Sequence, residues 1–186
     1  LYAPGSTFKM VVAIAGITHG IIDTNTKHFC SGKIGLGDRL YHCWKNNGHG
    51  SMNVSDAIKE SCDVFFYELG LKVGIDKISL MLKKLGLASN SNLELNELRK
   101  GLVPSKKWKL DIKGTRWTPG ETINASIGQG YMLSNPIELV TMVTRIANSE
   151  MMVEPTLLSQ SNKTKTFTKL NINQNHLNYI KNEMFN

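Results

Sequence analysis

The 186-residue chain lacks an apolar run as long as the roughly 18 to 20 residues that a membrane-spanning helix needs. It also lacks an arginine-rich tract, because its formal net charge of +7 comes from basic residues scattered along the sequence. This scatter argues against a nucleic-acid-binding strip and predicts a solvated basic surface, with an anionic cell-envelope polymer as the alternative partner. No internal repeat or domain linker is evident, and the 41% hydrophobic content suffices for one core.

Cysteine is scarce and its count is odd, so the three residues Cys30, Cys43 and Cys62 cannot all pair within the chain. His49 lies between the second and third cysteines, and a Cys3His set is a common ligand set of structural zinc sites. The spacing lacks the compact C-x-x-C knuckle of many zinc proteins. Two alternatives remain open: one disulfide with a buried free cysteine, or three small buried residues.

A Ser-x-x-Lys motif stands near the start of the chain. Pro4 and Gly5 bend the backbone, and Ser6 opens a run from 7 to 18 that predicts a buried helix. Lys9 follows Ser6 by about one helical turn, so both side chains project from one face. A lysine kept neutral by its surroundings can take the serine proton and create a nucleophile. The alternative is a helix cap beside an exposed lysine, but the apolar residues that follow Lys9 favour burial.

A serine–lysine site needs a further group to carry the proton to a leaving amine. Two tripeptides qualify, Ser51-Met52-Asn53 and Ser61-Cys62-Asp63. We assign Asn53 to capping the helix that follows it, because asparagine is a preferred N-cap residue. In the second tripeptide, Ser61 would relay the proton and Asp63 would hydrogen-bond Lys9 or the substrate, although both residues also suit a helix start.

The remaining patterns give a coarse outline of secondary structure. Gly128-Gln129-Gly130 predicts a tight turn that is too short for a phosphate-binding loop. The histidines outside the cysteine cluster are assigned to surface or loop positions, with His42 as a reserve metal ligand. The histidines assigned in this way, besides His42, are His19, His28 and His176. Helices are expected over 6–19, 54–60, 64–73, 75–85, 137–147 and 176–185. We also expect a strand-like stretch over 33–36, a loop over 41–50 and irregular structure over 88–121.

Four motifs follow one another along the chain, at 4–9, 48–50, 60–63 and 127–131. In this order they resemble the transpeptidase domain of the penicillin-binding protein 2 family, the class B cell-elongation enzymes of Gram-negative bacteria. The resemblance covers about 2–158 and implies a mixed α/β fold, in which helices surround an antiparallel sheet. We expect 1–186 to be a mostly helical part of that domain, with the core beside its first helix partly exposed. The motifs are Pro4-Gly5-Ser6-Thr7-Phe8-Lys9, Gly48-His49-Gly50, Glu60-Ser61-Cys62-Asp63 and Ile127-Gly128-Gln129-Gly130-Tyr131.

The resemblance implies a peptidoglycan D,D-transpeptidase at the periplasmic face of the bacterial inner membrane, with its membrane anchor outside this sequence. Ser6 would form an acyl-enzyme with a stem peptide, and beta-lactams would acylate the same serine. Lys9, Ser61 and Asp63 would complete the catalytic set, and Gly128, Gln129 and Gly130 would line the substrate cleft. Implied partners are stem peptides, beta-lactams and other elongation proteins including a glycosyltransferase, but no nucleic acid.

Two departures from the family pattern matter. The third family motif, Lys-Thr/Ser-Gly, is absent, and 163–165 (Lys-Thr-Lys) lacks its glycine. We therefore expect 1–186 alone to be weakly active or inactive. Relatives carry a metal site of Asp, His and Cys at the positions of the cysteine cluster. Since Cys30 and Cys43 would replace the aspartates here, the resemblance favours structural zinc on Cys30, Cys43, His49 and Cys62. The rival functions are a serine beta-lactamase and a non-catalytic penicillin-sensing or peptidoglycan-binding module.

Overall fold

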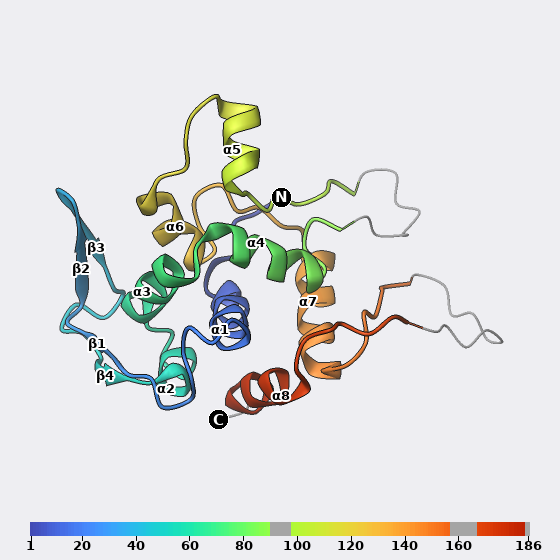
Figure 1. Cartoon of the computed structure of the whole chain (residues 1–186), viewed down its shortest axis with the longest axis horizontal. Coiled ribbons are helices and arrows are strands. Elements are labelled where there is room, and N and C mark those ends of the chain that lie inside the picture. The colour runs from blue at the N-terminus through green and yellow to red at the C-terminus, as the bar shows by residue number, and fades with distance from the viewer. Residues whose placement is uncertain (90–97, 157–166, 185–186) are drawn as a thin grey trace.

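The computed structural model describes residues 1–89, 98–156 and 167–184, and in these ranges most of the regular secondary structure is helical (Figure 1). Two short antiparallel ribbons accompany the helices. One pairs β1 (His28–Cys30) with β4 (Gly50–Met52), and the other pairs β2 (Lys33–Leu36) with β3 (Arg39–His42). The helices are η1 (Gly5–Phe8), α1 (Lys9–Thr18), α2 (Val54–Lys59), α3 (Asp63–Val73), α4 (Ile75–Lys84), α5 (Lys106–Lys113), α6 (Pro119–Ser126), α7 (Pro136–Asn148) and α8 (Gln174–Glu183).

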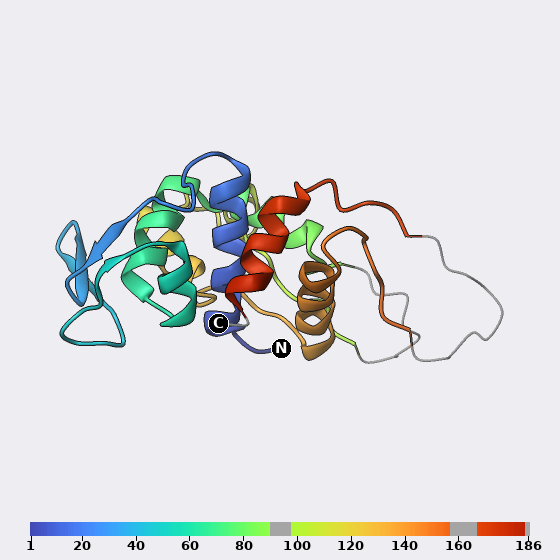
Figure 2. The same ribbon diagram turned by 90° about the horizontal axis from the view of Figure 1, so that it is seen from below.

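Helix α1 lies at the centre of the molecule. It packs against α3, α4 and α8, and Figure 2 shows α8 running beside it. Phe8, Val12 and Ile14 are fully buried. The expectation that the core beside the first helix is partly exposed is therefore wrong, because α8 and the neighbouring helices cover α1. None of the helices in the described residues has the length and apolarity needed to cross a membrane.

The expected helices after the first motif are confirmed to within a few residues, and their caps explain why. Asn53 accepts a hydrogen bond from the Asp56 backbone N–H (2.9 Å) and begins α2, as its residue type predicts. Asn135 does the same for α7 with Glu138, and Pro136 occupies the first helical position. The strand over 33–36 is also confirmed as β2.

The prediction of irregular structure over 88–121 is wrong for the residues of two helices, α5 and the start of α6, whereas 98–105 and 114–118 are irregular as expected. Ser105 begins α5 by accepting from the Trp108 N–H (3.0 Å). Pro119 takes the first position of α6, while the Glu121 carboxylate accepts from the Thr118 N–H (2.7 Å). Proline ends a helix when it stands inside one but favours a helix start at this position.

The expected loop over 41–50 is shorter than predicted. Tyr41 and His42 belong to β3, and Gly50 is already paired with Cys30 in the β1–β4 ribbon. The segment 43–49 thus connects the two ribbons and returns the chain beside Cys30. The tripeptide 163–165, rejected above as a third motif, lies outside the described residues.

Candidate active site and candidate metal centre

The first motif places Ser6 and Lys9 on the wall of one groove. Ser6 lies in η1 and is exposed, whereas Lys9 begins α1 and is only 2% exposed. The groove has a volume of about 480 Å³, and Ser61 lines it opposite the first motif. The remaining lining residues are Thr7, Met10, Ile58, Lys59, Glu183 and Met184. The serine that the sequence singles out is therefore open to a ligand, and the lysine lies beneath it.

The buried Lys9 ammonium is held by the second motif. Its Nζ atom donates to Ser61 Oγ at 2.9 Å, to the Ser61 carbonyl at 2.8 Å and to Asp63 Oδ1 at 2.6 Å. Three acceptors match the three protons of an ammonium group. The sequence motifs thus meet in space as predicted for Lys9, Ser61 and Asp63. In the described part of the chain, Ser6 shares the groove with Lys9 without a direct hydrogen bond to its Nζ atom.

Ser61 stands in an unusual backbone conformation between α2 and α3. Its φ is +52°, in the left-handed region that costs a residue other than glycine roughly 1 to 3 kcal/mol. The bend turns Ser61 and Asp63 toward Lys9. Since Lys9 bonds both the side chain and the carbonyl of Ser61, the ammonium helps to hold this conformation.

The glycine turn of 128–130 lies directly against the backbone that precedes Ser6. The Gly5 N–H donates to the Gly128 carbonyl at 3.0 Å. Gly128 has a φ of +70°, and a Cβ atom there would lie 2.3 Å from the Gly5 carbonyl oxygen. Only glycine allows this approach without displacement. Gln129 and Gly130 are exposed, so the turn places them at the surface next to the first motif.

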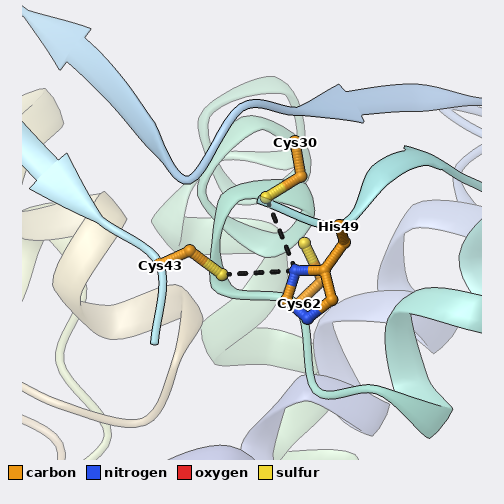
Figure 3. Close-up of side chains that lie close together, drawn as sticks. All are labelled: Cys30, Cys43, His49 and Cys62. Atoms are coloured by element: carbon orange, nitrogen blue, oxygen red, sulfur yellow. Dashed lines mark hydrogen bonds between the residues drawn. The ribbon is translucent and has the colours of Figure 1, made fainter. Parts of the chain in front are cut away.

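The three cysteines and His49 form one buried cluster (Figure 3). Their four candidate ligand atoms all lie within 4.8 Å of one another. The Sγ atoms of Cys30 and Cys43 are each 3.5 Å from His49 Nδ1. All three cysteines are buried free thiols. The predicted donor set therefore comes together: Cys30 ends β1, Cys43 and His49 lie in the segment that connects the two ribbons, and Cys62 lies between α2 and α3.

The cluster has dimensions that suit a tetrahedral zinc ion. Zn–S and Zn–N bonds of about 2.3 and 2.05 Å at a tetrahedral angle separate sulfur from nitrogen by about 3.6 Å. The two S···Nδ1 distances of 3.5 Å agree with this value. The His49 Nε2 atom is buried without a hydrogen bond, and Glu60 Oε2 lies 3.9 Å from it as a potential acceptor. Burial raises the pKa of the Cys62 thiol, so a thiolate there calls for a cation nearby.

Two glycines allow the loops of the cluster to cross. Gly48 has a φ of +75°, and a Cβ atom there would lie 2.1 Å from the Cys30 carbonyl oxygen. Gly32 approaches the Asn46 carbonyl oxygen equally closely, since its Cβ would lie 2.2 Å away. The Cys43 N–H also donates to the Gly32 carbonyl at 2.7 Å. Gly48 belongs to one of the sequence motifs, but the sequence does not predict this crossing.

Two histidines need correction or clarification. His28 is buried, not at a surface or loop position, and its Nδ1 atom pairs with the Glu68 carboxylate. Its ring also contacts Phe65 edge to face, with centroids 5.1 Å apart. His42, the reserve ligand, lies outside the cluster of four, and its backbone carbonyl accepts from the Tyr67 hydroxyl at 3.1 Å.

Comparison with known proteins places this geometry in a family. Residues 1–186 match the penicillin binding protein transpeptidase domain. The peptidoglycan D,D-transpeptidase MrdA of Salmonella typhimurium is 38% identical over 168 residues, which are 89% of this chain and 27% of that protein. The chain thus spans about a quarter of the length of this relative.

Solved structures agree with the sequence match. Penicillin-binding protein 2 from Helicobacter pylori superimposes with a TM-score of 0.91 at 30% identity, over 99% of this chain and 35% of that one. In its complex with MreC, the Helicobacter pylori protein gives a TM-score of 0.87 at 30% identity, over 97% of this chain and 33% of that one. The mixed α/β fold expected from the sequence is thus confirmed. The chain belongs to the penicillin-binding protein transpeptidase family.

Proposed function

We propose that the protein is a peptidoglycan D,D-transpeptidase of cell elongation that works through a Ser6 acyl-enzyme. The carrying observation is the buried Lys9 ammonium, bonded to Ser61 and Asp63 in the groove that Ser6 lines. A buried lysine next to a serine nucleophile and a second hydroxyl is an arrangement that can activate the serine for acyl transfer. The family match and the name of the Salmonella relative support the same reaction.

The proposed chemistry divides into two acyl transfers. Ser6 Oγ attacks the carbonyl of the penultimate D-alanine, and its proton passes to the Lys9–Ser61 pair once Lys9 is neutral. The peptide bond to the terminal D-alanine then breaks, and Ser61 delivers the proton to the leaving amine. An amine of a second stem peptide next attacks the carbonyl of the Ser6 ester, the C–O bond to Ser6 breaks, and the amine proton passes through the Lys9–Ser61 pair to Ser6 Oγ, which restores the free serine. Beta-lactams would enter the first step and remain as esters of Ser6.

The glycine turn would position the substrate in this mechanism. Gly128 supports the backbone at Gly5, which leads directly to the nucleophile. The exposed Gln129 and Gly130 would contact the peptide beside Ser6. The Lys-Thr/Ser-Gly motif that other family members use is absent from 1–186, so this segment alone should react slowly.

We also propose that Cys30, Cys43, His49 and Cys62 hold a structural zinc ion. The S···N distances, the burial of the cluster and the three thiols favour zinc over harder cations. Zinc would carry out no step of the reaction and would instead fix the loop that precedes the second motif. Metal analysis of protein purified without chelator should find one zinc per chain. A Cys30–Cys43 disulfide without metal would refute this assignment.

The proposed partners follow from the substrate and from the relatives. Stem peptides would be donor and acceptor, and a glycosyltransferase that makes the glycan strands would work alongside the protein. The Helicobacter pylori relative has been solved in complex with MreC, which supports an elongation assembly for this protein too. Such a substrate lies in the periplasm, so we propose the periplasmic face of the inner membrane as its location.

Labelling of the full-length protein with a fluorescent penicillin tests the proposal. Mass spectrometry should locate one label per chain on Ser6, and Ser6→Ala should abolish it. Lys9→Ala should lower the labelling rate constant by about a hundredfold or more, as for the loss of a general base. Absence of label from Ser6 would refute the acyl-enzyme. Fast multiple turnover of nitrocefin would identify a serine beta-lactamase instead, and labelling without cross-linking of stem peptides would identify a penicillin sensor.

A further inference from the structure

Trp44 lies at the junction of the two sites although neither motif includes it. It follows Cys43 directly, in the segment that connects β3 and β4. Its side chain is 63% exposed, so core packing does not explain its position. Both of its N–H groups are nevertheless used, and each donates to the stretch that carries Ser61 and Asp63.

The bonds from Trp44 complete the fixation of the second motif. Its backbone N–H donates to Asp63 Oδ2 at 2.9 Å, while Lys9 occupies Oδ1 at 2.6 Å. The carboxylate is therefore held at both oxygens. The indole Nε1–H donates to the carbonyls of Glu60 and Ser61, each at 3.1 Å. These carbonyls flank the point where the backbone enters the left-handed conformation at Ser61.

Trp44 is equally tied to the metal cluster. It is bonded through the chain to Cys43, and its ring meets the His49 ring edge to face with centroids 5.3 Å apart. A shift of either residue would move the indole. Since the same indole bonds the Ser61 carbonyl, such a shift would also reach the bend that aims Ser61 at Lys9.

We infer that Trp44 is a positioning residue for the acyl transfer, which holds Ser61 and Asp63 against Lys9 and links them to the cysteine cluster. The inference rests on the proposed function, because it concerns the rate of Ser6 acylation. It assigns Trp44 no contact with substrate. Its effect is on where the proton-carrying hydroxyl of Ser61 lies relative to Lys9 Nζ.

The test compares Trp44→Phe with the full-length wild type. Phenylalanine retains an aromatic ring beside His49 but removes the indole N–H together with the five-membered ring that carries it, a loss of size that the control variant below shares. We expect the rate constant of fluorescent penicillin labelling to fall by roughly tenfold, the scale of one hydrogen bond. The labelling stoichiometry and the bound zinc should stay unchanged. Trp117→Phe is the matched control, because it removes an indole N–H that bonds Thr122 Oγ1 at 2.8 Å and not the second motif. It should label within about twofold of wild type.

Hydrogen–deuterium exchange provides a readout that does not depend on activity. In Trp44→Phe, the peptide that covers 60–66 should exchange faster than in wild type, and in Trp117→Phe it should not. An unchanged labelling rate constant or unchanged exchange over 60–66 would overturn the inference. A lower labelling stoichiometry at an unchanged rate constant would also overturn it, since that is the signature of lost folding. Failure of wild-type Ser6 to label would refute the proposed function, and the exchange experiment would still decide the position of Trp44.

Discussion

Gly128→Ala is the sharpest test of how the glycine turn supports the nucleophile. In the structure a Cβ atom at this position would lie 2.3 Å from the Gly5 carbonyl oxygen and 2.8 Å from the Gly5 nitrogen. Both neighbours are backbone atoms, so no side chain can rotate away. Van der Waals contact requires the two segments to separate by roughly 1 Å. The backbone that leads to Ser6 would move with Gly5.

The size of the effect follows from that displacement. Alanine at a φ of +70° adds roughly 1 to 2 kcal/mol of backbone strain, and loss of the Gly5–Gly128 hydrogen bond adds about 1 kcal/mol. Stability therefore falls moderately. A misplacement of about 1 Å at a reacting group can slow a reaction by about a hundredfold. We expect a loss of this order in the rate constant of Ser6 labelling.

The assay measures both consequences in the full-length protein, by thermal unfolding and by fluorescent penicillin labelling. Gly20→Ala is the control, since Gly20 has a φ of +63° and no atom within 4 Å of its Cβ position. It should carry the backbone strain alone and label at the wild-type rate. Equal labelling rates for Gly128→Ala and Gly20→Ala would show that the close approach to Gly5 does not position Ser6.

Three further predictions address other parts of the molecule. Gly48→Ala should abolish zinc binding, because its Cβ atom would lie 2.1 Å from the Cys30 carbonyl oxygen. The control Gly37→Ala, at a position with a φ of +56° and no neighbouring atom within 4 Å, should retain the metal. Equal zinc contents in the two variants would contradict the loop crossing. Burial alone would raise the pKa of the Glu121 carboxyl, but hydrogen bonds from Lys109 and Thr118 outweigh burial. The net pKa of Glu121 therefore lies below its usual 4.5. The ionised Glu121 carboxylate therefore stabilises the folded protein fully above pH 4.5, and this stabilisation is lost as the pH falls through the lowered pKa of the folded state. The melting-temperature difference between wild type and Glu121→Gln should thus shrink from pH 7 to pH 3. The isolated segment 1–186 should label with fluorescent penicillin far more slowly than the full-length protein, and stoichiometric labelling at the same rate would refute this.

The meeting of Lys9 with Ser61 and Asp63, which lie 52 and 54 positions away, was predicted from the chemistry that a serine–lysine site needs and from the family resemblance. Helix starts at Asn53 and Asn135 were equally predictable, since a capping side chain acts on residues two or three positions away. The helices α5 and α6 were not predicted, because Pro104 and Pro119 favour irregular structure unless a helix begins beside them. Their start depends on Ser105 and on the Thr118–Glu121 bond, which are weak signals beside the prolines.

Contacts between distant segments could not be predicted from the residues alone. The burial of α1 depends in part on α8, whose sequence is polar apart from a few apolar residues such as the buried Leu177 and Ile180. The role of Trp44 depends on donors that reach across 16 to 19 positions of the chain. Local sequence patterns cannot predict such hydrogen bonds, because the residues next to Trp44 in the sequence do not determine which distant carbonyls its indole N–H meets.

The two-faced link between α2 and α3 constrains how this segment can change. Ser61 and Asp63 contact Lys9, whereas Cys62 between them belongs to the cysteine cluster. Three consecutive side chains therefore alternate between the candidate active site and the candidate metal centre. Substitution at one of these positions first affects the site that its side chain faces. An inserted or deleted residue would change the direction of all three side chains and disrupt both sites at once. The length of this segment should therefore tolerate less change than its composition.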